Sequence, residues 1–115
     1  MAVITALVDH LSRVPGVRGA VVAARRDGIV VAEALHEGLD GDALAALATS
    51  LIERCGRVAR AAGREPPAMV QLRATGGTLV AGPVGGELVA CAVAAPDANL
   101  GLVRLAIAES QGALA

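Results

Sequence analysis

The reactive side chains of this sequence are few, and their spacing fits no common catalytic or metal-binding pattern. His10 and His36 are the two histidines, and neither has a second histidine four residues away, the spacing that places two metal ligands on one face of a helix. Cys55 and Cys91 are the two cysteines, and neither has a histidine close by in the sequence that could activate it as a nucleophile. We therefore predict surface histidines, reduced buried thiols and no metal site.

The remaining candidates for chemistry are serines, carboxylates and glycine-rich turns. The three serines lack the G-x-S-x-G turn of a nucleophile elbow, and the carboxylates are spread over separate elements. The segment 82–86 (GPVGG) lies between two predicted strands, whereas a phosphate-binding loop opens a helix, and the chain contains no lysine. The sequence therefore predicts a protein that is not an enzyme and that binds no cofactor.

The composition narrows the class of partner. Hydrophobic residues make up 55% and charged residues 18% of 115 residues, so polar surface is scarce and a buried partner face is favoured. A net charge of −1 without any aromatic residue argues against nucleic-acid binding. Charges and glycines interrupt each apolar run well before the roughly 20 residues of a membrane span, and the amino terminus does not resemble a signal peptide. We expect a cytoplasmic protein with neither a nucleic-acid nor a membrane partner.

The first part of the chain predicts a helix and a hairpin. Apolar residues recur at helical spacing over 2–14, where they form one face. Residues 17–25 and 28–35 are short segments rich in β-branched residues, as is typical of strands. Between them, Asp27 and Gly28 are suited to the positive φ angles of a tight hairpin turn. These two strands should be antiparallel neighbours.

The rest of the chain predicts two more helices and three more strands. Asp40 or Asp42 can cap a long helix that runs to about residue 62. The later elements are expected as strands at 68–74, 78–83 and 87–94, and as a helix from Asp97 or Asn99 to about residue 111. The order is α-β-β-α-β-β-β-α. Since the first and fifth strands are apolar on both faces, we predict an α/β fold, a three-layer α/β/α sandwich around a five-stranded, mostly antiparallel sheet, as a single domain over 1–115.

This element order and four local motifs resemble the Roadblock/dynein light chain family, in particular its bacterial GTPase regulators. The motifs are LSRVPGVRGAVV at 11–22, RDGIVVA at 26–32, AALATSL at 45–51 and NLGLVR at 99–104. The resemblance implies a homodimer, or a heterodimer with a paralogue, in which the third strands pair across a two-fold axis and the second helices pack side by side. It further implies that a small Ras-like GTPase binds the helical face and that its GTP hydrolysis is stimulated.

The long second helix carries two apolar stripes at 100° per residue. The stripe expected to pack on the sheet is Leu44, Leu47, Ala48, Leu51, Cys55, Val58 and Ala62. The stripe expected at the dimer interface consists almost wholly of small residues, which let a second helix approach closely: Ala45, Thr49, Ile52, Gly56, Ala59 and Gly63. Contact of this second stripe with another element of the same chain is the alternative.

A charged sector of the same helix supplies the candidate docking residues for a GTPase. Its members are Glu53, Arg57, Arg60 and Arg64, together with Asp42. A solvated face without a partner is the simpler interpretation of these residues. Two other functions stay open, a structural adaptor that does not affect nucleotide turnover and a small-ligand sensor.

Overall fold

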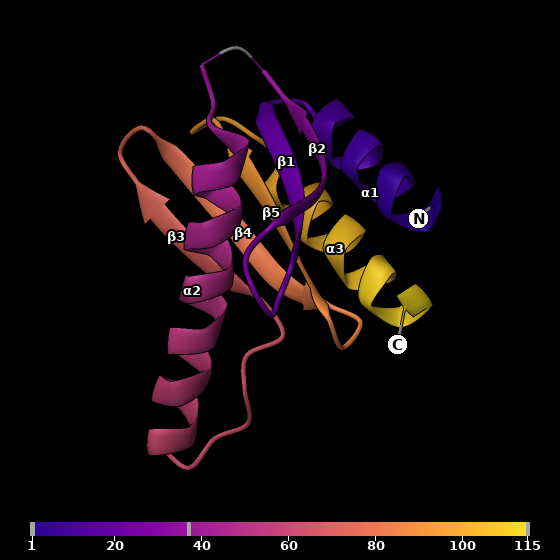
Figure 1. The fold of residues 1–115 in the computed structure, drawn as a ribbon. Coiled ribbons are helices and arrows are strands. Elements are labelled where there is room, and N and C mark those ends of the chain that lie inside the picture. Colours follow the sequence, from indigo (N-terminus) through magenta and orange to yellow (C-terminus); the bar gives the residue numbers. More distant parts are fainter. Residues whose placement is uncertain (1, 37, 115) are drawn as a thin grey trace.

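The computed structural model describes residues 2–36 and 38–114, which form three helices and one sheet (Figure 1). In chain order the elements are α1 (Ala2–Arg13), β1 (Val17–Ala24), β2 (Val30–Leu35), α2 (Gly41–Ala61), β3 (Val70–Ala74), β4 (Gly77–Val84), β5 (Leu88–Ala94) and α3 (Leu100–Leu114). The predicted order is confirmed, and most boundaries agree within two or three residues.

The sheet has five strands in the order β2-β1-β5-β4-β3, and each neighbouring pair is antiparallel. β1 and β5 are interior strands, as predicted from their apolar sequences, and Val21, Val22, Ala90 and Cys91 are at most 2% exposed. β2 and β3 are the two edge strands.

The helices form two outer layers, so the predicted α/β/α sandwich is confirmed (Figure 1). α1 and α3 pack on one face of the sheet, where the larger core contains Leu11, Val22 and Ile107. α2 alone covers the other face, where the core is smaller and includes Ile52 and Val89. The two faces of the sheet are therefore covered unequally.

Side-chain caps decide where two of the helices begin. The Asp40 carboxylate accepts a hydrogen bond from the amide of Ala43 at 3.1 Å, so Asp40 rather than Asp42 caps α2. Asn99 Oδ1 accepts a hydrogen bond from the amide of Leu102 at 3.2 Å, so Asn99 rather than Asp97 caps α3.

The turn between β1 and β2 differs from the predicted two-residue hairpin. Gly28 has a φ of 73°, but no described residue other than glycine has a positive φ, so Asp27 does not share this conformation. The amide of Gly28 donates to the carbonyl of Ala24 at 2.8 Å, and Asp27 Oδ1 accepts from the amide of Ile29 at 3.1 Å. These bonds close a longer turn that needs only one left-handed residue, and β2 begins later as a consequence.

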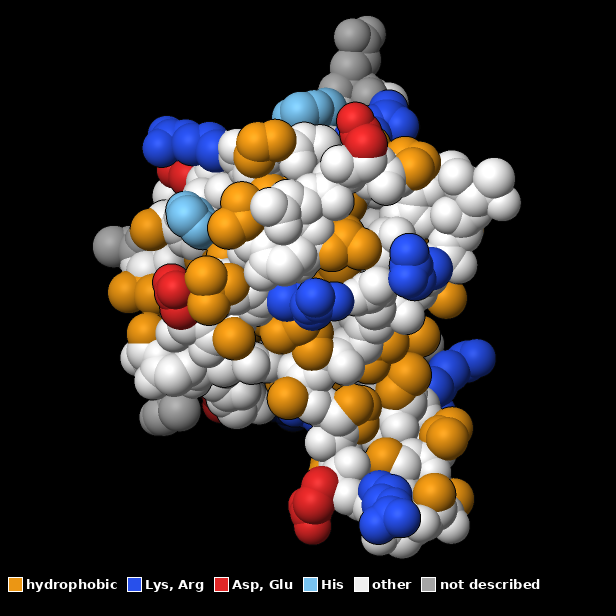
Figure 2. Space-filling view, turned by 180° about the vertical axis from the view of Figure 1, so that it is seen from behind, with side chains coloured by type: hydrophobic (Ala, Val, Ile, Leu, Met, Phe, Trp, Pro, Cys, Tyr) orange, Lys and Arg blue, Asp and Glu red, His pale blue; other side chains and the backbone are white. Residues whose placement is uncertain are grey.

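The carboxyl-terminal part of α2 extends past the end of the sheet (Figure 1). Its last sheet-facing buried residue is Gly56, and Arg57, Val58, Arg60 and Ala61 are exposed. Seen from behind, this end stands away from the body of the molecule (Figure 2). Within 2–36 and 38–114, no helix has both the length and the apolar character required to cross a membrane.

Candidate protein–protein interaction surface

The side of α2 that faces the sheet carries small residues from both predicted stripes. Ala48 packs on the sheet as predicted, whereas the larger residues of its stripe do not, and most of the stripe predicted at the dimer interface lies there instead. Ala45, Ile52 and Gly56 are buried beneath the helix, and Thr49 is 9% exposed. Ala45 packs with Val21 and Ala23 of β1, and Ile52 packs with Val89 and Cys91 of β5. The contact expected across a dimer is thus a contact within the chain for these four members of the predicted interface, Ala45, Thr49, Ile52 and Gly56.

Close approach of helix and sheet explains this arrangement. The strands beneath α2 present alanine, valine and cysteine, so a helix with alanine on its inner side can lie close to them. The hydroxyl of Thr49 donates to the carbonyls of Ala45 and Ala46, each at 3.0 Å, and is satisfied within the helix. Ala59 continues the same row along α2, whereas Gly63 follows the end of the helix with a φ of 72°; for these two the dimer contact stays a prediction.

The larger apolar residues of α2 face sideways, and we call them the leucine stripe: Leu44, Leu47, Leu51, Cys55 and Val58. Leu47 is 65% and Val58 is 70% exposed, whereas the other three are half-buried. Beside the stripe, Leu72 of β3 is 56% exposed on the same face of the sheet. Leu44, Leu72 and Leu79 line one groove of about 280 Å³ between α2 and the β3–β4 hairpin. Helix and sheet edge together therefore present one exposed apolar surface.

The opposite flank of α2 is charged, and we call it the arginine flank: Glu53, Arg57 and Arg60, together with Arg64. Arg64 was predicted on the same helix face but follows the end of α2 at Ala61, and all four residues are exposed. At 3.6 residues per turn the three residues within the helix lie roughly 150° around it from the leucine stripe. The β1–β2 turn packs on α2 before the flank begins, because a Cβ added at Gly28 would lie 3.0 Å from Thr49 Oγ1 and 3.3 Å from the Cα of Ala46. The two sides of α2 thus point to opposite edges of the sheet.

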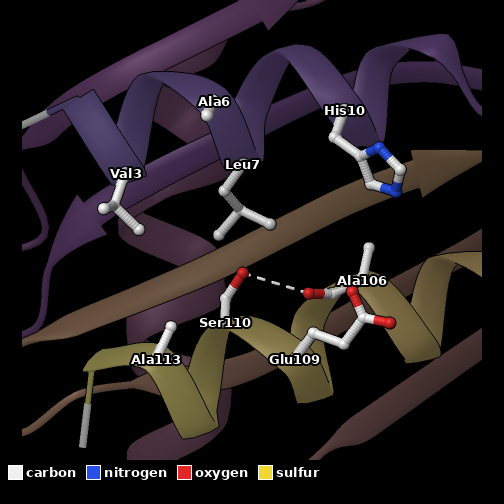
Figure 3. Close-up of a pocket in the computed structure, with 8 residues that line it drawn as sticks. All are labelled: Val3, Ala6, Leu7, His10, Ala106, Glu109, Ser110 and Ala113. Atoms are coloured by element: carbon white, nitrogen blue, oxygen red, sulfur yellow. Dashed lines mark hydrogen bonds between the residues drawn. The ribbon is translucent and has the colours of Figure 1, made fainter.

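A second apolar groove, of about 260 Å³, lies between α1 and α3 (Figure 3). Its lining residues are Val3, Ala6, Leu7 and His10 from α1 and Ala106, Glu109, Ser110 and Ala113 from α3. His10 and Glu109 lie on opposite walls, and the hydroxyl of Ser110 donates to the carbonyl of Ala106 at 3.0 Å. Since most of the lining is apolar and the serine is already bonded, the groove lacks a convergent set of polar groups.

The reactive groups are separated in space. Burial raises the pKa of the Cys91 thiol to about 12, which keeps this side chain protonated and unreactive at neutral pH. Cys55 is half-buried within the leucine stripe. Among residues 2–36 and 38–114, no three histidine, cysteine or acidic side chains lie close enough together to hold a metal ion.

The strand order β2-β1-β5-β4-β3, with α2 alone over one sheet face and α1 and α3 over the other, defines a small α/β/α domain. The model of the Roadblock/LC7 domain matches residues 3–94, and the chain belongs to this family. No curated protein matches the chain in sequence.

Solved structures share the fold across nearly the whole chain. MglB of Myxococcus xanthus superposes with a TM-score of 0.83 at 21% identity, covering 96% of this chain and 84% of MglB. The gliding protein MglB of Thermus thermophilus gives a TM-score of 0.82 at 20% identity, covering 98% and 86%. A Roadblock/LC7 domain from Streptomyces avermitilis gives 0.77 at 22% identity, covering 97% and 91%. At these identities the similarities establish the fold.

Two parts of the surface were missed by the sequence interpretation. The leucine stripe was assigned to the core, and Leu72 was not singled out, because periodicity shows that two stripes exist but not which of them faces inward. The contact between the β1–β2 turn and α2 depends on how a hairpin packs on a helix 18 or more residues later in the chain. No local signal in the sequence reports that contact.

Proposed function

We propose that this protein is a non-enzymatic Roadblock regulator that acts in the cytoplasm. It pairs with a second copy of itself, or with a paralogue, through the leucine stripe and the neighbouring face of β3. The pair then binds a small Ras-like GTPase through the arginine flank and modulates its GTP hydrolysis. In this proposal the leucine stripe takes the place of Ala45, Thr49, Ile52 and Gly56 at the dimer interface. The docking residues for the GTPase are those predicted from the sequence: Glu53, Arg57, Arg60 and Arg64.

The symmetry of the leucine stripe is the observation that carries the pairing. Leu47 and Cys55 lie four residues to either side of Leu51, and Leu44 and Val58 lie seven residues to either side. The stripe therefore has the same spacing in both directions along the helix. Two antiparallel copies would place each Leu51 against the other, and Leu47 against Cys55 of the partner subunit. A self-complementary patch of this kind suits a two-fold interface.

The exposed edge of the sheet supports the same arrangement. β3 is an edge strand, and α2 leaves much of its face uncovered, as the 56% exposure of Leu72 indicates. Pairing of two β3 strands would satisfy their free backbone groups and bring the partner's α2 over this face. MglB with a tetrameric arrangement, which superposes at a TM-score of 0.80 and 22% identity, gives a precedent for self-association on this fold.

Disulfide formation tests the pairing and its register. In an antiparallel pair centred on Leu51, the two Cys55 residues lie eight residues apart along the axis, about 12 Å. The native thiols should not cross-link, whereas Leu47→Cys should form a disulfide with Cys55 of the partner subunit under mild oxidation. Leu105→Cys, on the exposed side of α3, is the matched control. Absence of the Leu47→Cys cross-link in a protein that light scattering shows to be dimeric would refute this register.

Direct titration tests whether a small Ras-like GTPase binds this protein. Each purified small Ras-like GTPase from the same genome, loaded with a fluorescent GTP analogue, is titrated with the wild type and with Arg57→Glu/Arg60→Glu. We expect one GTPase to bind the wild type and to hydrolyse GTP at a changed rate, and the charge reversal to weaken binding without splitting the dimer. Binding with an unchanged hydrolysis rate would instead favour the structural adaptor. Failure of every GTPase to bind would contradict the proposed function.

A further inference from the structure

The turn between β1 and β2 carries two arginines that the proposed function has not used. Arg25 and Arg26 are exposed and line a hollow of about 430 Å³ between this turn and the turn that precedes β5. The remaining charged groups of the hollow are Asp27 and Glu87. The arginines therefore lie at the end of the sheet past which α2 extends (Figure 1).

The backbone of this turn is fixed rather than loose. The amide of Arg25 donates to the carbonyl of Glu87 at 2.8 Å, and the amide of Gly28 donates to the carbonyl of Ala24 at the same distance. Asp27 Oδ1 is engaged with the amide of Ile29. A turn held at three points presents its two arginines with little backbone freedom left to lose on binding, which favours affinity.

The turn packs on the part of α2 that precedes the arginine flank. A Cβ added at Gly28 would lie 3.3 Å from the Cα of Ala46 and 3.0 Å from Thr49 Oγ1, and Glu53, the first residue of the flank, follows Thr49 by about one helical turn. Turn and flank together carry five arginines among three carboxylates, a net charge of +2 in a chain whose net charge is −1. Such a local excess attracts an acidic partner surface over a distance of several ångströms.

We propose that Arg25 and Arg26 form the second half of the GTPase-docking surface, so that an acidic face of the GTPase sits in the corner between the β1–β2 turn and the overhanging end of α2. This inference rests on the proposed function. It predicts that the GTPase contacts the end of the sheet as well as the helix, and that both contacts are electrostatic.

The test compares three double charge reversals that alter net charge equally. Arg25→Glu/Arg26→Glu changes the turn, Arg57→Glu/Arg60→Glu changes the flank, and Arg13→Glu/Arg104→Glu changes exposed arginines on the α1–α3 side. Affinity for the GTPase that binds the wild type is measured at several salt concentrations. We expect the turn and flank variants to bind about tenfold or more weakly and with a shallower salt dependence, while the control stays within a few fold.

The outcomes separate the inference from the function on which it rests. A turn variant that binds like the control, while the flank variant is weakened, would overturn the role of Arg25 and Arg26 alone. Unchanged binding of both the turn variant and the flank variant would contradict the whole proposed docking surface. Sedimentation with phosphatidylserine vesicles provides a further arm, and vesicle binding by the wild type that the turn variant loses would assign these arginines to an anionic lipid instead. Circular dichroism and light scattering verify that each variant is folded and paired.

Discussion

Replacement of Leu47 by serine tests the leucine stripe in isolation. Complete burial of a leucine side chain contributes about 1.5–3 kcal/mol, and 65% of the Leu47 side chain is still exposed in the single chain. Covering the rest at an interface would therefore contribute about 1–2 kcal/mol per copy and about 2–4 kcal/mol for a symmetric pair. At about 1.4 kcal/mol per factor of ten, Leu47→Ser should raise the Kd of the dimer roughly 30- to 700-fold.

Sedimentation equilibrium over a dilution series measures this Kd, and urea unfolding measures the stability of the chain itself. Because Leu47 is mostly exposed in the single chain, Leu47→Ser should change the free energy of unfolding of that chain by no more than about 0.5 kcal/mol. Leu105→Ser is the matched control, since Leu105 is 53% exposed on α3 at the other face. An unchanged Kd for Leu47→Ser, or an equal loss for Leu105→Ser, would refute the assignment of the interface to α2.

Three further changes probe the fold. Gly56→Ala should raise the free energy of unfolding by about 1 kcal/mol, because the added Cβ meets only Arg60 Nη1 at 3.5 Å and alanine favours the helix; a loss in thermal unfolding would show that the site has no room. Gly77→Ala should lower stability by about 2 kcal/mol or more, since the Cβ would lie 2.5 Å from the carbonyl oxygen of Ala94 at a φ of 151°, and an unchanged urea midpoint would contradict this contact. The pKa of the Cys91 thiol is higher in the folded state than in the unfolded state, so its contribution to the free energy of unfolding should be complete below pH 9 and about 1.4 kcal/mol smaller by pH 10. Urea titrations below pH 9 and at pH 10 measure this loss, which Cys91→Ala should not show.

Much of the fold could be predicted because local patterns determined it. Every buried position of β1 and β5 is apolar or glycine, so their interior location follows from their sequences. Glycine and proline pairs separated the strands, and the long middle segment had helical spacing throughout. These signals depend on neighbours along the chain and needed no knowledge of tertiary contacts.

The orientation of α2 could not be predicted in this way. Both of its stripes are apolar, and the choice between them depends on how closely the helix can approach β1 and β5, a property of the packed structure. The small-residue stripe was assigned to a dimer because small side chains let a second helix approach closely, but they also let the helix approach the sheet. Ala45 and Gly56 are instead inside, and Leu47 and Val58 remain exposed. The turn geometry was likewise set by the bond from Gly28 to Ala24, which a two-residue interpretation of Asp27 and Gly28 does not include.

The overhang of α2 should divide this helix into two parts with different amide exchange rates. The first four turns lie on the sheet and can open only with the core, whereas the amides near Arg60 have no strand beneath them and should exchange with solvent through local fraying. Deuterium uptake at this end would then fall when a partner occupies the corner beside it. Deuterium uptake at the carboxyl-terminal end of α2 could therefore be used to measure partner binding in a protein that has no tryptophan or tyrosine for fluorescence.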